Sequence, residues 1–260
     1  MRHQIDVRGA RLTAESHGAG SDLVLVHGID SDRHAWDGFW IELAQSRRVT
    51  RYDLRGFGES VTLEQGAFRH SHDLQALLDA LAIQRCDLLG VSMGGSICLN
   101  FALDFPDRVR RLALINPGMV AWQWSEEWRS AWRPIVDAAQ AGDMARAREL
   151  WWNHPIFATT RLLPAAARKL REMIERCSGR YWLGNDEEPM LPDIDRLTSL
   201  SAPTLLLTGS EDLPDFRLIA DLIEAAAPNA RRKDYQGVGH LLPLERPEEF
   251  RHDTIEFFAD

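Results

Sequence analysis

A serine with the surroundings of a nucleophile lies in the first half of the chain. Ser92 is the centre of the run G-V-S-M-G at 90–94, between an apolar segment, 86–91, and a segment with helical character, 94–103. A serine on a tight turn from strand to helix projects its hydroxyl from the sheet edge, and the flanking glycines let neighbouring chain segments pack closely. The pattern therefore predicts that Ser92 is a nucleophile.

A base and an acid for this serine are predicted near the end of the chain. A serine hydroxyl attacks only when a base takes its proton, and an acid must orient that base. Asp212 follows an apolar strand predicted at 203–209, and His240 lies in a loop between a polar strand at 231–235 and the last helix. Glu211 is the alternative acid, but adjacent residues on an extended segment point in opposite directions. Serine, aspartate and histidine occur in the order expected with such a turn.

Acyl transfer also needs donors for the negative oxygen of a tetrahedral intermediate. One donor is expected to be the backbone N–H of Met93, which follows the serine. The other is expected to be the N–H of Ile29, in the loop after the strand at 22–26, where Gly28 lets the backbone approach a substrate. His27, at the end of that strand, is interpreted as a structural residue.

Other kinds of site are not predicted. Asn116 ends the strand at 109–115 and cannot carry the charge that an acid needs, and the remaining histidines show no metal-binding spacing. Gly56 and Gly58 lack the third glycine of a dinucleotide site, so we interpret them as a turn that supports Asp53 and Arg55. No metal or cofactor is expected. The cysteines are interpreted as small buried side chains: Cys86, Cys98 and Cys177.

The composition limits the class of protein. With 260 residues, 45% of them hydrophobic, the chain can bury one large core. Its net charge of −9 argues against nucleic-acid binding, which needs a basic face. Residues 1–6 lack the apolar core of a signal peptide, and no apolar run is long enough to cross a bilayer. We expect a soluble cytoplasmic monomer or homodimer that acts on a small molecule.

The alternation of strands and helices predicts an α/β fold with a mostly parallel sheet covered by helices. A hairpin through residues 8–9 begins the chain, and helices are expected at 36–45 and 70–81. The alternation stops after 117 and resumes after 200; between them helices are expected at 126–141, 143–152 and 164–177. The predicted organisation is a core in two parts, 1–117 and 201–260, with a helical cap inserted at 118–200.

Seven of the nine tryptophans lie in this insertion, which demands an explanation. Trp124, Trp128 and Trp132 recur every four residues, so they form one face of a helix that must be buried. Either this face packs the insertion onto the core, or some of it lines an apolar substrate pocket. The candidate pocket residues are Trp124, Trp128, Trp132, Trp151 and Trp152.

Several short motifs resemble those of the α/β-hydrolase fold superfamily, in the branch that carries a helical cap. They are H-G at 27–28, D-L-R-G-F-G-E-S at 53–60, G-V-S-M-G-G at 90–95, G-S-E-D at 209–212 and G-H at 239–240 with E-R-P at 245–247. The S-M-G-G run is similar to that of enol-lactonases and small-molecule esterases. The resemblance does not extend to 118–200, so it predicts the fold and the triad and leaves the substrate open.

The function expected from this resemblance is a serine hydrolase of small to medium carboxylic esters or lactones. Dehalogenases and epoxide hydrolases of the fold carry aspartate in place of Ser92. Carbon–carbon bond hydrolases usually have G-P-G after H-G, where this chain has I-D-S at 29–31. They stay as an alternative with the same triad, and a binding protein that keeps the pocket without catalysis is a further one.

Overall fold

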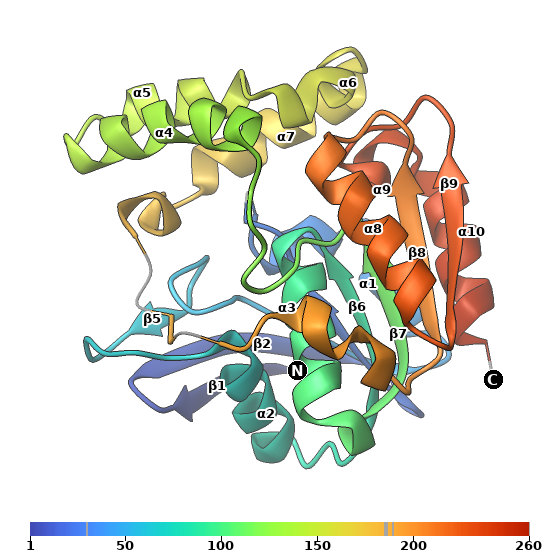
Figure 1. Ribbon diagram of the computed structural model, residues 1–260. Coiled ribbons are helices and arrows are strands. Elements are labelled where there is room, and N and C mark those ends of the chain that lie inside the picture. The colour runs from blue at the N-terminus through green and yellow to red at the C-terminus, as the bar shows by residue number, and fades with distance from the viewer. Residues whose placement is uncertain (30, 185–186, 189, 260) are drawn as a thin grey trace.

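A mostly parallel β-sheet forms the centre of the computed structural model, which describes residues 1–260 except 30, 185–186, 189 and 260. In the described residues the strand order is β1-β2-β4-β3-β6-β7-β8-β9, with β5 paired to β2 (Figure 1). Pairs involving β2 are antiparallel, and the others are parallel. The strands are β1 Arg2–Val7, β2 Ala10–His17, β3 Asp22–Val26, β4 Arg48–Tyr52, β5 Val61–Thr62, β6 Cys86–Val91, β7 Val109–Ile115, β8 Thr204–Gly209 and β9 Ala230–Tyr235.

Helices cover both faces of the sheet, as its apolar strands require. Along β3, Val24 and Val26 join one core cluster while Leu23 and Leu25 join the other, because successive side chains point to opposite faces. The helices α2 His70–Ala80, α3 Met93–Asp104 and α8 Pro214–Ala226 pack in the first cluster. The second contains α1 Trp40–Leu43, α9 Leu242–Glu245 and α10 Pro247–Phe258. The sheet is therefore buried between two helical layers, which confirms the predicted fold class.

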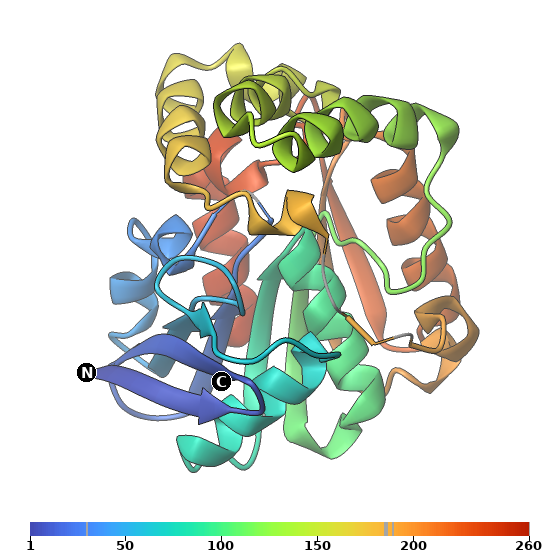
Figure 2. The ribbon, with the colours of Figure 1, turned by 90° about the vertical axis from the view of Figure 1, so that its left-hand side faces the viewer.

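The helical insertion is the chain between β7 and β8, and it lies across the carboxyl end of the sheet (Figures 1 and 2). Its longer helices share a separate core cluster, to which α8 contributes Phe216 and the loop before α9 contributes Leu241. The insertion therefore packs on the core near the loops that follow β8 and β9. Its helices are α4 Glu126–Gln140, α5 Met144–Trp152, α6 Ala158–Arg161 and α7 Pro164–Arg176, with short 3-10 turns at Pro155–Phe157, Arg180–Leu183 and Asp193–Ser199.

Local sequence signals explain where these helices begin. Ser125 Oγ accepts a hydrogen bond from the N–H of Trp128 at 3.1 Å and caps α4. Asp143 Oδ1 accepts from the N–H of Arg146 at 2.9 Å and caps α5. Such side-chain acceptors satisfy first-turn N–H groups that have no partner within the helix. Pro164 begins α7, where its missing N–H costs nothing.

Two parts of the predicted organisation differ from the structure. The single helix expected at 36–45 is instead a 3-10 turn, Arg33–Trp36, followed by α1. Asp32 caps the turn through the N–H of His34, which starts the helical segment earlier than its apolar pattern indicates. Near the end of the expected insertion, Leu197 and Leu200 pack in the main core beside α3. The chain thus returns to the core before residue 200.

None of the helices in the described part of the chain is both long and apolar enough to cross a membrane.

Candidate active site

Ser92 lies between β6 and α3 in a backbone conformation that serine rarely adopts. Its φ is 54° and its ψ is −117°. Such strain persists only where the surroundings fix it, and here the N–H of Ser92 donates to Ile115 O at 2.9 Å while its carbonyl accepts from the N–H of Gly118 at 3.1 Å. Strained residues of this kind cluster at functional sites. The turn therefore has the geometry of a nucleophile elbow.

The two flanking glycines make this turn sterically possible. A Cβ on Gly94 would lie 2.2 Å from the carbonyl oxygen of Val26, and a Cβ on Gly90 would lie 2.4 Å from that of Gly94. Both distances are shorter than van der Waals contact. Because neither residue carries a side chain, the first turn of α3 packs directly on β6 and on the end of β3.

His240 and Asp212 meet at the end of the parallel sheet where this turn also lies. The Nδ1 of His240 lies 2.8 Å from Oδ2 of Asp212, and both side chains are buried. The other carboxylate oxygen of Asp212 accepts from the N–H of Leu213 at 2.7 Å. In the described chain, Nε2 of His240 is buried without a hydrogen-bond partner, so it can accept a proton. Glu211, the alternative acid, is exposed, and its side chain contacts Ser210.

Asn116 fixes the loop that carries His240. Its Nδ2 donates to the carbonyl oxygens of Gly239 at 3.1 Å and His240 at 2.7 Å. Its Oδ1 accepts from the N–H of Gly209 at 3.0 Å. The amide thus connects the ends of β7 and β8 to the histidine loop. In the sequence, Asn116 was considered only as a residue that cannot serve as the catalytic acid. Its position at the end of a strand was the one signal that it could hold the histidine loop.

The expected oxyanion donors lie near the serine. Met93 is the first residue of α3, where the N–H has no intrahelical partner, and Ile29 belongs to the loop after β3. Both line the same cavity as Ser92. His27 orients the loop: its Nε2 accepts from the N–H of Leu54 at 3.0 Å, and Nδ1 lies 2.8 Å from Gly28 O. Burial lowers the pKa of His27, which favours the neutral ring that this pairing needs.

A cavity of about 560 Å³ opens above Ser92. This volume is within the usual range for small-molecule sites. One wall is aromatic and comes mainly from the insertion, while Tyr181 also borders a second, smaller cavity. The aromatic residues that line the main cavity are Trp122, Trp124, Trp128, Trp132, Tyr181 and Phe216.

The five tryptophans predicted to line a pocket divide into two groups. Trp124 and Trp128 are stacked with ring centres 4.6 Å apart, Trp128 and Trp132 with centres 5.8 Å apart, and all three line the cavity. Trp151 does not reach it, because it is 1% exposed and packs inside the insertion against Phe157. Trp152 does not line the cavity either. Its ring stacks under the guanidinium group of Arg171.

Phe216 joins the aromatic wall to the histidine, and sequence reasoning did not single it out. Its ring centre lies 5.5 Å from that of Trp128 and 4.4 Å from that of His240. It is at the start of α8, four residues after Asp212. An apolar residue in a helix that begins at Pro214 is expected to be buried. Nothing in the sequence indicated that Phe216 would contact the histidine.

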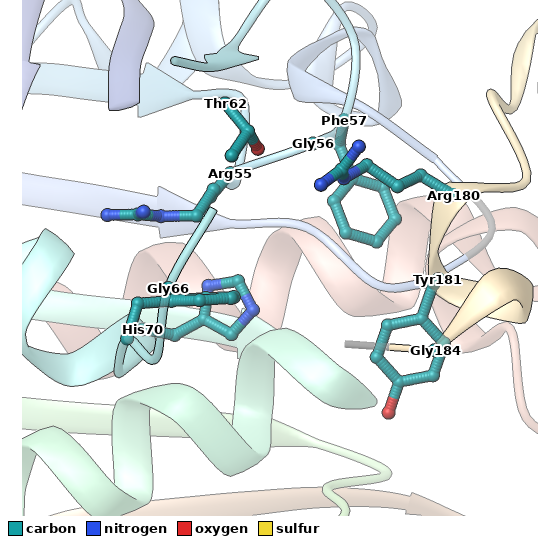
Figure 3. Close-up of a pocket in the computed structure, with 10 residues that line it drawn as sticks. Arg55, Gly56, Phe57, Thr62, Gly66, His70, Arg180, Tyr181 and Gly184 are labelled. Atoms are coloured by element: carbon teal, nitrogen blue, oxygen red, sulfur yellow. The ribbon is translucent and has the colours of Figure 1, made fainter. Parts of the chain in front are cut away.

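The smaller cavity, of about 30 Å³, adjoins the main one and has room for a water molecule (Figure 3). Arg55, Gly56 and Phe57 border it from the core, whereas Arg180 and Tyr181 come from the insertion. Arg55 is engaged by Asp73 at 2.7 Å, as expected for a residue that stabilises the turn. His70 and Tyr181 line both cavities, so the smaller one belongs to the same site.

Within the described lining of the main cavity, both basic side chains are paired. His70 Nε2 lies 3.0 Å from a carboxylate oxygen of Glu187, and Arg129 lies 2.8 Å from Glu126 at the exposed rim. A substrate carboxylate in this space would have to compete with those partners.

Comparisons with known proteins agree with this architecture. Residues 23–147 match the model of the alpha/beta hydrolase fold family. The chain is 35% identical to 2-hydroxymuconate semialdehyde hydrolase from a Pseudomonas species, covering 99% of this chain and 93% of that protein. The chain belongs to the α/β-hydrolase superfamily.

Solved structures give the same result for the fold. A thermophilic esterase from Thermogutta terrifontis is 28% identical with a TM-score of 0.81, and the match covers 99% of this chain and 97% of that one. The enol-lactonase from Burkholderia xenovorans has a TM-score of 0.84 at 23% identity, covering 99% and 100% of the two chains. At that identity, the second likeness is evidence for the fold alone.

His154 provides a pH-dependent test of how the insertion packs at this site. Its Nδ1 accepts from the N–H of Ile156 at 3.3 Å, while Nε2 is buried without a partner in the described chain. Burial, then the charges of His240 and Arg161, lowers its pKa to about 4. Between this value and the ordinary 6.5, the unfolded chain binds a proton that the folded protein does not, so stability falls as the pH drops through this window.

We therefore predict that Asn at position 154 flattens the pH dependence of unfolding. Asn offers an acceptor in place of Nδ1 and does not titrate. The His154→Asn protein is expected to lose about 3 kcal/mol less stability than the wild type between pH 7 and pH 4. Urea titrations at a series of pH values measure this difference. If the free energy of unfolding changed equally with pH in the two proteins, the lowered pKa of His154 would be wrong.

Proposed function

We propose that the protein is a serine hydrolase that cleaves small to medium carboxylic esters or lactones through an acyl-enzyme on Ser92. The observation that carries the proposal is the strained Ser92 at the edge of the large cavity, with a buried His240–Asp212 pair at the same end of the parallel sheet. Strain, a base and an orienting acid together are what an activated serine needs.

The proposed reaction uses each group once in acylation and again in deacylation. His240 Nε2 takes the proton of Ser92 as its oxygen attacks the substrate carbonyl, then gives the proton to the leaving alcohol oxygen. Asp212 holds Nδ1–H and stabilises the imidazolium. The N–H groups of Ile29 and Met93 donate to the tetrahedral oxyanion. A water molecule, deprotonated by the same histidine, releases the acid and restores Ser92.

The substrate class follows from the cavity. The aromatic wall favours an apolar acyl or alcohol group, and the paired charges of His70 and Arg129 favour a neutral substrate. The likeness to an esterase at 28% identity supports ester hydrolysis.

A carbon–carbon bond hydrolase is the second candidate, and one observation favours it. The 35% identity to 2-hydroxymuconate semialdehyde hydrolase spans nearly the whole chain. The loop at 29–31 has I-D-S in place of the G-P-G usual in such enzymes, and the described cavity lining offers no unpaired cation for an acidic substrate.

A substrate panel tests the proposal directly. It contains neutral esters of increasing acyl length, lactones and a dienol ketone acid, and kcat/KM is measured for each with the wild type and with Ser92→Ala. We expect neutral esters or lactones to be the best substrates and Ser92→Ala to be inactive. Faster cleavage of the dienol compound would support the second candidate, and no turnover of any compound, with no labelling by a fluorophosphonate, would refute both.

The choice of acid makes a separate prediction. Asp212→Asn is expected to lower kcat by about 10⁴-fold, the cost of the equivalent change in a serine protease, because the amide favours the wrong histidine tautomer. Glu211→Gln is the matched control, since Glu211 is exposed and has no contact with His240 in the described chain. A larger loss in the control than in Asp212→Asn would show that the acid is misassigned.

The aromatic wall makes a prediction about selectivity. Trp128→Ala is expected to change the ratio of kcat/KM between bulky and short acyl esters by about 10- to 200-fold, the range for altered fit in an apolar pocket. Trp152→Ala is the control, because Trp152 is on the same insertion but outside the cavity. The proposed pocket is wrong if the two variants change the ratio equally.

A further inference from the structure

Glu245 links the histidine loop to the helical insertion. Its buried carboxylate accepts three hydrogen bonds. Oε2 accepts from the N–H of Gly239 at 2.8 Å, next to His240. Oε1 accepts from the hydroxyls of Thr159 at 2.9 Å and Thr160 at 2.5 Å, both in α6. Figure 1 shows α6 above α9, the short helix that Glu245 ends.

Gly239, the residue before His240, is held from two sides. Its N–H donates to Glu245, and its carbonyl accepts from Asn116 at 3.1 Å. A Cβ on Gly239 would lie 2.0 Å from Thr159 Oγ1, so this backbone packs directly against α6. The core side of the loop is thus fixed by Asn116, and its other side is fixed by the carboxylate bound to the insertion.

A buried carboxylate makes this link sensitive to both partners. If α6 moved away, Oε1 would lose both hydroxyl donors, and an unpaired buried charge is costly. Glu245 would then have to move or bind water. The N–H of Gly239 would lose its well-oriented acceptor. The position of the histidine loop therefore depends on the docking of α6.

Asp215 shows that a buried carboxylate can hold the insertion without reaching the histidine loop. It accepts from Trp122 Nε1 at 2.9 Å and from Ser125 Oγ at 2.6 Å, both at the start of the insertion. The described chain gives it no bond to residues 239 or 240. Glu245 differs because its two oxygens serve two separate parts of the fold.

We propose that Glu245 is a positioning residue that makes the placement of His240 depend on the docking of helix α6, an inference that rests on the proposed serine mechanism. Proton transfer from Ser92 requires Nε2 within hydrogen-bond reach, and a displacement of about 1 Å can cost about 100-fold in rate. The insertion would therefore contribute to the chemical step as well as to substrate binding.

Variants at both ends of the link test the proposal. Glu245→Ala is expected to lower kcat per titrated Ser92 by about 100-fold with KM unchanged. The double variant Thr159→Val with Thr160→Val removes only the hydroxyls on the insertion side, and we expect a smaller loss in kcat of the same kind. Glu245→Gln keeps an oxygen for the Gly239 N–H and should recover part of the rate.

Thr254→Val is the matched control for the threonine variants. Thr254 is buried in α10, and its hydroxyl has no hydrogen-bond partner in the described chain. It should keep the wild-type kcat. Normalising to active sites removes the effect of partial unfolding, which would lower the titrated fraction instead of kcat. A wild-type kcat per site in both Glu245→Ala and the double threonine variant would overturn the proposal.

An NMR measurement separates this inference from the proposed function. The proton shared by His240 Nδ1 and Asp212 should give a downfield resonance that reports the histidine position without any substrate. We expect the double threonine variant to shift or broaden it and Thr254→Val to leave it unchanged. If the wild type is neither active nor labelled, the proposed function fails, and this resonance still decides whether α6 positions His240; an unchanged signal in the threonine variant refutes the link.

Discussion

The close packing of α3 against the end of β3 is the constraint on which the rest of the site depends. Gly94 lies so near the carbonyl groups of Val26 and His27 that any side chain would collide with the backbone. This contact brings the start of α3 beside the loop after β3, so Met93, Ile29 and Ser92 border one cavity. The strain at Ser92 is sustained by a different neighbour, since its N–H and carbonyl are bound to the end of β7 and the loop after it, at Ile115 and Gly118.

The core and the proposed triad could be predicted because their signals are local. Apolar runs such as 86–91 and 203–209 have few alternatives to a buried strand, and polar residues after parallel strands must gather at one edge. Asp212 and His240 were predicted from this rule, and the structure brings them within 2.8 Å. The bounds of the short helix α1 were predicted less well. Asp32 caps a 3-10 turn before it, and this cap outweighed the apolar periodicity that follows.

The arrangement of the insertion is harder to predict, because periodicity identifies a buried face without identifying what covers it. Trp128 and Trp151 are both aromatic residues on amphipathic helices, yet one faces the cavity and the other the interior of the insertion. The difference depends on how α4 and α5 pack together. The roles of Asn116 and Glu245 were equally hidden, since both depend on partners distant in sequence. Asn116 must donate as well as accept, which an ionised carboxylate at this position could not do.

The surroundings of His240 explain why the insertion can bring a second histidine close to it. An imidazolium on His240 would be opposed by a positive charge on His154, and the same repulsion helps to lower the pKa of His154 to about 4. Burial therefore favours a neutral His154, and in the proposed mechanism Asp212 pairs with the imidazolium formed on His240. Phe216 separates His240 from the tryptophan wall with an apolar ring. The insertion thus adds aromatic surface above the proposed nucleophile, while His154, which it brings near His240, stays neutral.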